Sequence, residues 1–337
     1  MKTDFDLYKH RKNNGKAIRN AALAGGKKAA GKHAYIAAAV LLVVFLIFFL
    51  LNDRFFKIDG IPTFDEIFSG SGFKPSADIA EGNISVHFID VGQGDCQLIL
   101  SDSGTVLIDC GEREYSNRVI SYIRSLNISR LDYVIASHPH SDHIGGMSYI
   151  LDEFDIGTVI MPDIQKSVIP TTNTYARLLK SVSDNDIKVE YARAGSEYKI
   201  GGAVMTVLSP VKDYEDLNNY SVAVKIVHGQ NSFLFTGDIE KEAEADILND
   251  GADVSASVLK VAHHGSSTSS HKGFLDAVSP VYGVISVGTG NDYGHPHKET
   301  IKRFNNIGIR IYRTDHNGSI IFTSDGKDLE IKTEKEV

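Results

Sequence analysis

The chain has 337 residues, of which 42% are hydrophobic and 23% charged, a composition typical of a globular protein with a sizeable core. Its formal net charge is -8, but the charge is unevenly distributed. Eleven of the 35 Lys and Arg residues, and three of the 43 Asp and Glu residues, lie within residues 1–57, so a basic leader precedes an acidic body. This acidity argues against a broad, non-specific DNA-binding face, which needs Lys and Arg to displace counterions.

An apolar run at residues 34–51 predicts a transmembrane helix. The run has no charged residue and is just long enough to span a bilayer. Nine Lys and Arg residues precede it, so the positive-inside rule places residues 1–33 in the cytoplasm as a basic tail and the acidic body outside the cell membrane. A cleaved signal peptide is the alternative, but no small-x-small site follows the run, which favours an uncleaved single-pass anchor. Residues 52–82, with several Gly, Pro and Ser, are expected to link the anchor to a domain at residues 83–337.

Short apolar runs typical of strands alternate with segments of helical spacing throughout this domain. Strands that first meander and then alternate with helices, twice over, predict an α/β fold in which two mixed sheets pack face to face with helices outside, an αββα sandwich. The predicted strands are 84–90, 96–100, 106–110, 131–136, 158–161, 188–191, 203–208, 221–227, 233–236, 258–262, 281–287, 309–312 and 319–322. The predicted helices are 116–126, 147–154, 175–182, 241–248, 274–278 and 299–307.

The two cysteines lie in the first predicted hairpin. A symmetric turn at residues 101–105 would pair Leu100 with Val106 and Cys96 with Cys110 across the two strands. A disulfide is permitted outside the cytoplasm. Cross-strand geometry is poor for a disulfide, however, so two buried free thiols are favoured.

The sequence His138-Pro139-His140-Ser141-Asp142-His143 follows a predicted strand and precedes a Gly-Gly pair. Imidazole and carboxylate are the ligand types that suit zinc, manganese or iron. Histidines and aspartates also gather in ordinary polar loops. Four of them within six residues, directly after a buried strand, predict a metal site instead.

Three further predicted strands also end in polar residues. Asp238 follows one of them, the pair His263 and His264 follows the next, and His295 follows the third. Each has an ordinary explanation when taken alone, since an Asp after a Gly is usually a turn or a helix cap. Their repetition in the same strand-end context indicates that they gather at one site.

These motifs resemble those of the metallo-β-lactamase superfamily. Within it, they are similar to one branch, the metallo-hydrolase domain of ComEC-type DNA-uptake channels and its free-standing relatives. The similarity covers residues 84–325. The motifs that carry it are Asp90-Val91-Gly92-Gln93-Gly94-Asp95, Leu107-Ile108-Asp109-Cys110-Gly111, the His138 to His143 cluster, Thr236-Gly237-Asp238, His263-His264-Gly265-Ser266, Gly294-His295-Pro296 and residues 313–318.

The chain departs from the family pattern in two respects. Residues 218–221, Asn-Asn-Tyr-Ser, stand where many members of the superfamily have a histidine ligand. His228 is close by in sequence, but it lies at a predicted hairpin tip and is not taken as the substitute. In addition, one helix cannot form a DNA pore, so the domain is expected to act without an attached channel.

The resemblance implies a centre of two divalent ions, zinc or manganese, that share a hydroxide and hold both reacting oxygens of a phosphoryl group. His138 and His140 would bind the first ion. Asp142 and His143 would bind the second ion, and Asp238 would bridge the two.

Three further histidines have expected roles in this centre. One of His263 and His264, with His263 the nearer candidate, would complete the first ion's ligands, and His295 would join those of the second. His264, or whichever of the pair is not a ligand, would contact the substrate phosphate or protonate the leaving oxygen, because neighbours on an extended segment face opposite ways. Asp109 would orient a histidine or serve only as a turn residue. The expected catalytic residues are Asp142, His264 and Asp238.

The function expected from the sequence is that of a membrane-anchored, extracytoplasmic, metal-dependent phosphodiesterase acting on nucleic acid, DNA more than RNA. A cell-wall polymer with phosphodiester links, such as a teichoic acid, is the alternative substrate. A non-catalytic metal-binding module is the alternative from another class. The complete set of ligand types in the histidine cluster argues against that module.

Overall fold

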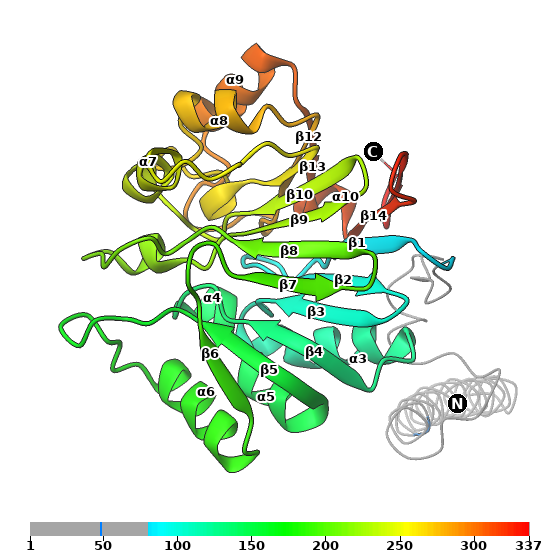
Figure 1. Cartoon of the computed structure of the whole chain (residues 1–337), viewed down its shortest axis with the longest axis vertical. Coiled ribbons are helices and arrows are strands. Elements are labelled where there is room, and N and C mark those ends of the chain that lie inside the picture. The colour runs from blue at the N-terminus through cyan, green and yellow to red at the C-terminus, as the bar shows by residue number, and fades with distance from the viewer. Residues whose placement is uncertain (1–47, 49–79, 337) are drawn as a thin grey trace, which may run out of the picture. The chain divides into compact units, whose positions relative to one another are not determined.

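The computed structural model describes residues 80–336 and Phe48 (Figure 1). Residues 73–337 form a compact unit of their own. The predicted basic tail, the anchor except Phe48, and the linker as far as residue 79 lie outside the described residues. Among the described residues, no helix has the length and apolar character needed to cross a membrane.

Two mixed sheets form the centre of the described domain. In each sheet, one half is antiparallel and the other parallel: β3 to β6 run parallel in the first sheet, and β10 to β13 in the second. The first sheet has the order β15 (Leu329–Thr333), β14 (Ile320–Ser324), β1 (Ile84–Phe88), β2 (Gln97–Ser101), β3 (Gly104–Ile108), β4 (Arg130–Ile135), β5 (Asp155–Met161), β6 (Lys188–Tyr191). The second has the order β13 (Arg310–Arg313), β12 (Tyr282–Ile285), β11 (Val258–Lys260), β10 (Asn231–Phe235), β9 (Val224–His228), β8 (Ala203–Val207), β7 (Glu197–Ile200).

Helices cover the outer face of each sheet (Figure 1). On the first sheet, α3 (Ser116–Ser125), α5 (Met147–Glu153) and α6 (Asn173–Asp184) pack their buried apolar residues against the strands. On the second, α7 (Lys241–Asn249), α8 (Lys272–Val278) and α9 (Lys298–Ile307) do the same. The shorter helices are η2 (Arg113–Tyr115), α4 (Ser141–Ile144), η3 (Leu217–Tyr220), η4 (Ala262–Gly265) and α10 (Thr314–Asn317).

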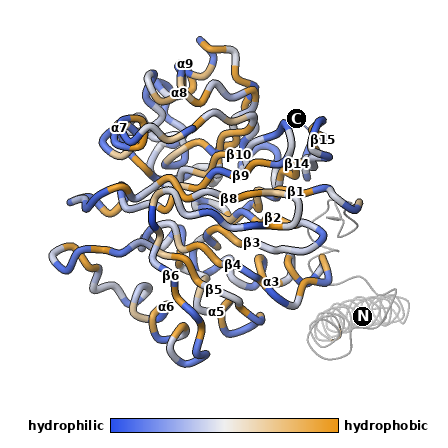
Figure 2. The backbone as a smooth tube through the Cα atoms, viewed as in Figure 1, coloured by the Kyte–Doolittle hydropathy of each residue, from blue (hydrophilic) through white to orange (hydrophobic). Residues whose placement is uncertain are grey.

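A core shared by the two sheets lies between them. Val86 and Ile99 of the first sheet pack in one buried cluster with Ile226 and Phe233 of the second. Figure 2 shows hydrophobic residues along the strands and hydrophilic residues in many of the connecting loops. Three apolar layers, one between the sheets and one under each group of helices, confirm the predicted αββα sandwich.

The predicted hairpin around the cysteines is present, but the predicted register was wrong by one residue. Ser101 pairs with Gly104, so the turn holds two residues and Leu100 faces Thr105 rather than Val106. A two-residue turn matches the twist of the flanking strands better than the symmetric five-residue turn expected from sequence. Both cysteines are buried and free, which confirms the expected thiols. Burial raises the pKa of each thiol.

Two strands were missed because they lie at the sheet edges. β7 has the sequence EYKI and β15 has the sequence LEIKT, and each ends a sheet. Charged residues are common on edge strands, where they discourage pairing with another chain. The same charges shorten the apolar runs by which strands are recognised in a sequence.

A buried glutamate and an arginine hold the loop at residues 266–271. Glu244 of α7 accepts hydrogen bonds from the backbone N–H groups of Ser270 and His271, and His271 Nδ1 lies 3.1 Å from the same carboxylate. Arg303 of α9 donates to three backbone carbonyl oxygens of the loop at 2.7 to 3.0 Å. The two outer helices therefore fix the chain directly after the His263–His264 pair.

This arrangement predicts a pH-dependent contribution to stability. Burial raises the pKa of Glu244 to about 7, although the backbone donors act in the opposite direction. In the unfolded chain a glutamate titrates near its ordinary value of about 4.3. Between these two values the folded state binds more protons, so the contribution of Glu244 favours folding at low pH and is lost as the pH rises through 7.

Glu244→Gln is expected to remove this dependence. The difference in unfolding free energy between wild type and variant should change by on the order of 3 kcal/mol between pH 4.5 and 7.5, at about 1.4 kcal/mol per pH unit. Urea unfolding at a series of pH values measures it, with Glu299→Gln, at an exposed position of α9, as the matched control. A difference that stays constant with pH would contradict the expectation.

Candidate metal centre

The candidate site lies at the carboxyl ends of parallel strands from both sheets. Asp109 follows β3, and the cluster at residues 138–143 follows β4. In the second sheet, Asp238 follows β10, while His263 and His264 lie in η4 just after β11. Ligand sites in α/β folds form preferentially at such strand ends.

The turn that precedes β2 packs tightly against the histidine cluster. Gly94 has φ +141°, and a Cβ atom there would lie 2.3 Å from the carbonyl oxygen of Asp142. The N–H group of Asp95 donates to that same oxygen at 3.0 Å. Only glycine permits this approach, so Gly94 allows the turn to support the loop that carries Asp142.

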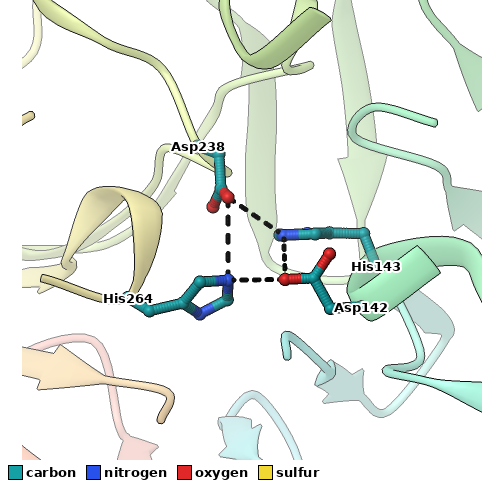
Figure 3. A group of neighbouring side chains, drawn as sticks. All are labelled: Asp142, His143, Asp238 and His264. Atoms are coloured by element: carbon teal, nitrogen blue, oxygen red, sulfur yellow. Dashed lines mark hydrogen bonds and ion pairs between the residues drawn. The ribbon is translucent and has the colours of Figure 1, made fainter. Parts of the chain in front are cut away.

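Four side chains converge in a group that we call the tetrad: Asp142, His143, Asp238 and His264 (Figure 3). Each offers one ligand atom, and these atoms all lie within 4.8 Å of one another. His143 Nε2 and Asp238 Oδ1 are buried without a hydrogen-bond partner, an unusual condition for buried polar atoms. Two imidazole nitrogens, two carboxylates and these unpaired atoms fit a divalent cation.

Asp238 Oδ2 lies among four imidazole Nε2 atoms. The distances are 3.3 Å to His143, 3.6 Å to His264, 3.7 Å to His263 and 3.9 Å to His138. Asp142 Oδ2 in turn lies 3.1 Å from His264 Nε2. His138 Nε2 lies 2.9 Å from His140 Nδ1. Asp238 Oδ2 is therefore close both to the tetrad histidines and to His138 and His263.

The segment that carries the histidine pair is not extended, so the expectation of opposite-facing neighbours was wrong. His263 and His264 both adopt left-handed backbone conformations, with φ 51° and 53°. This conformation is uncommon and costly for residues other than glycine. It is supported by a hydrogen bond from His263 N to Gly237 O at 3.1 Å and by close packing of Gly265, where a Cβ atom would lie 2.6 Å from Pro296 Cβ. The turn directs both rings toward Asp238.

His295 lies outside the tetrad. Its ring centroid is 6.2 Å from that of His264 and 5.5 Å from that of His263. Burial lowers the pKa of His295 to about 4, with the neighbouring histidines as further causes. His264 thus occupies the place beside Asp142 and His143 that the sequence analysis expected for His295.

Hydrogen bonds orient the tetrad histidines. Asp109 accepts from Ser137 N at 2.8 Å, from Ser137 Oγ at 2.6 Å and from His143 Nδ1 at 2.8 Å, which confirms that Asp109 orients a histidine. His264 Nδ1 donates to the carbonyl oxygen of Ser286 at 2.9 Å. These bonds place a proton on each Nδ1, so each Nε2 faces the carboxylates of the tetrad and is the ring atom that would bind a metal.

The side chain of Ser221 lies between the backbone of Asp238 and the ring of His138. Ser221 Oγ accepts a hydrogen bond from Asp238 N at 2.9 Å and lies 3.2 Å from His138 Nδ1. His228, at the end of β9, instead has its ring nitrogens 2.8 Å from Ser324 Oγ and from Gly82 O. This confirms that His228 is not the substitute.

Lys260 is the site residue that the sequence analysis missed. It is 1% exposed, forms an ion pair with Asp95, lies 3.9 Å from Asp238 Oδ1 and donates to Gly237 O at 3.2 Å. In the sequence, this lysine stands in the middle of an otherwise apolar predicted strand, residues 258–262. A lysine inside a buried strand nevertheless requires a partner, and that requirement was the available signal.

At Asp238 and His143, the charges of several neighbouring side chains together outweigh the effect of burial on the pKa. Burial acts to raise the pKa of Asp238, but His143 and His264 hold it well below its usual value. Asp238 and its neighbouring carboxylates raise the pKa of His143 well above its usual value, against the effect of burial. For His138, burial lowers the pKa and the proximity of His143 lowers it further. The carboxylates and the imidazoles of the tetrad therefore stabilise each other's charged forms.

A cavity of about 540 Å³ opens onto this centre. None of its described lining residues is Lys or Arg. The lining residues include Gln93, His140, Asp142, Thr172, Thr174, Asp238, His263, His264, Tyr293 and His295.

Residues 89–289 match the family described as the Metallo-beta-lactamase superfamily. The chain therefore belongs to this superfamily. It is 30% identical over 260 residues to "ComE operon protein 3" of Bacillus subtilis (strain 168), covering 72% of this chain and 33% of that protein. It is also 30% identical over 256 residues to "Competence protein ComA" of Neisseria gonorrhoeae, covering 74% of this chain and 33% of that protein. The chain thus spans about a third of the length of these curated relatives.

Among solved structures, the chain is similar to the metallo-beta-lactamase fold protein YhfI from Bacillus subtilis. The TM-score is 0.49 at 14% sequence identity, covering 72% of this chain and 100% of that one. The family match and the competence-protein relatives confirm the predicted resemblance for the domain.

Replacing Lys260 tests whether its charge compensates the buried carboxylate of Asp95. Lys260→Met leaves Asp95 buried without its cation and is expected to cost about 3–5 kcal/mol of unfolding free energy in metal-free protein. Lys225→Met is the matched control, because Lys225 is also buried but pairs with the exposed Asp253 and should cost about 1 kcal/mol or less. Urea unfolding measures both, and equal costs would contradict this account of Lys260.

Proposed function

We propose that the chain is a metal-dependent phosphodiesterase that hydrolyses nucleic acid, DNA in preference to RNA. The single observation that carries this proposal is the position of Asp238 Oδ2 among four imidazole Nε2 atoms at 3.3–3.9 Å. A carboxylate oxygen this close to four imidazole nitrogens is suited to bridge two cations. Membership of the superfamily supports a metal-dependent hydrolase, and relatives named for competence support nucleic acid as the substrate.

The proposed ligands of the first ion, zinc or manganese, are His138, His140, His263 and Asp238. Those of the second are Asp142, His143, His264 and Asp238. His264 replaces His295 in this assignment, because His264 belongs to the tetrad and His295 does not.

When bound, two such ions activate a water molecule and stabilise the attacking and leaving oxygens of a phosphoryl group. The protein's own residues supply the geometry. Asp109 and the carbonyl oxygen of Ser286 fix the ring orientations of His143 and His264. His295 lines the cavity with its ring largely neutral at pH 7, which suits it to hydrogen-bond a substrate oxygen.

Asp238→Asn tests the proposal. The variant should lose metal and lower kcat on oligonucleotides by more than about a hundredfold, since even the outer partners of metal ligands contribute 10- to 100-fold. Metal content is measured by plasma mass spectrometry, with two ions expected per wild-type chain. Activity is measured with zinc, with manganese and with a chelator, on DNA, RNA and a teichoic acid.

His316→Ala is the control for that experiment, because His316 is exposed and does not line the cavity. It should keep both metal and activity. Full activity and unchanged metal content in Asp238→Asn would refute the proposed centre, whereas hydrolysis of the teichoic acid alone would change the substrate.

We also propose that residues 34–51 anchor the chain in the cell membrane with the domain outside. The support is the uncharged apolar run and the nine Lys and Arg residues before it. Protease added to intact cells should digest the domain and spare a tag placed before Lys32. Digestion of the tag with survival of the domain would reverse the proposed orientation.

A further inference from the structure

Three aligned rings lead from the candidate metal centre to the rim of the cavity. The rings of His264 and His295 have centroids 6.2 Å apart and an interplanar angle of 29°. The rings of His295 and Tyr293 have centroids 5.7 Å apart and an angle of 19°. Tyr293 is therefore the outermost member of a roughly parallel series that begins in the tetrad.

Tyr293 is 66% exposed, the largest value among the exposed large hydrophobic side chains of the described residues. Its loop is nevertheless well held. Asn291 accepts a hydrogen bond from His295 N at 3.0 Å and donates to the carbonyl oxygens of Gly288 and His295 at 3.0 and 2.7 Å. His297 Nε2 lies 3.3 Å from the carbonyl oxygen of Tyr293. The fold thus presents an aromatic face to solvent on a fixed loop.

Apart from the candidate metal centre, the cavity has few groups that would attract a polyanion. Its described lining contains no Lys or Arg, so a nucleic acid gains no contact with either side chain there. Stacking on an aromatic ring supplies affinity without charge, and it tolerates any base because every base has a flat π face. The face of Tyr293 that does not stack on His295 is suited to this contact.

We propose that Tyr293 is a stacking platform for a nucleobase whose adjoining phosphodiester occupies the metal cavity. This inference rests on the proposed phosphodiesterase function. It makes the preferred substrate single-stranded, because the base faces of a duplex are covered by their neighbours. A polyol phosphate has no base to stack, so Tyr293 distinguishes nucleic acid from a teichoic-acid type of polymer.

The test compares full-length wild type, Tyr293→Ala and Tyr293→Phe on three substrates. These are single-stranded oligothymidylate, an abasic deoxyribose-phosphate oligomer of the same length, and poly(glycerol phosphate). Tyr293→Ala should raise KM for oligothymidylate about 10- to 100-fold with kcat nearly unchanged. It should leave the abasic oligomer unaffected, and Tyr293→Phe should behave as wild type. Tyr191→Ala, at an exposed tyrosine of β6 that does not line the cavity, is the matched control.

The outcomes separate this inference from the function on which it rests. If wild type hydrolyses oligothymidylate but Tyr293→Ala does so with unchanged KM, the stacking platform is overturned and the phosphodiesterase stands. An equal rise in KM for the abasic oligomer or for poly(glycerol phosphate) would also overturn it, because the ring would then contact the backbone. If wild type hydrolyses none of the three substrates with either metal, both proposals fail.

Discussion

The burial of three carboxylates is the constraint on which the rest of the structure depends. Asp95, Asp109 and Asp238 are 1%, 0% and 2% exposed where the strand ends of the two sheets meet. A buried carboxylate is costly unless donors or cations surround it. Lys260 compensates Asp95, while Ser137 and His143 compensate Asp109. Asp238 has imidazoles around it, and its Oδ1 atom has no hydrogen-bond partner. The position beside this carboxylate therefore favours the binding of a further cation.

The surrounding architecture explains how such a site is kept in place. Each sheet contributes the carboxyl ends of its parallel strands, and the antiparallel halves complete the core between the sheets. Loops and the short helices α4 and η4 carry the candidate ligands, but buried contacts hold these segments. Gly94 fits against the Asp142 loop, while Glu244 and Arg303 secure the segment after His264. The left-handed conformation of the histidine pair is consistent with strain that a rigid surrounding structure maintains at a functional site.

Most of the fold followed from the sequence because apolar runs mark buried strands directly. The register of the β2–β3 hairpin did not, since it depends on a turn whose length the sequence leaves open. The edge strands β7 and β15 were missed because charged residues interrupt their apolar pattern. The apolar pattern of the sequence is thus enough to predict the fold class. The register of strand pairs and the position of edge strands depend on local geometry that this pattern does not contain.

The sequence predicted which residues belong to the candidate site better than it predicted how they are arranged. Asp142, His143, Asp238 and His264 were all singled out from strand-end motifs, and the structure brings them together. Which of two adjacent histidines joins them depends on two non-glycine residues with positive φ, a conformation without a sequence signature. Lys260 escaped notice because its strand is otherwise apolar.

The most direct test of the central claim is anomalous X-ray diffraction from crystals of the chain grown with Mn²⁺. The account predicts two anomalous peaks on either side of Asp238. One should lie among Asp142, His143 and His264, and the other among His138, His140 and His263. A well-ordered site without an anomalous peak beside Asp238 would contradict it.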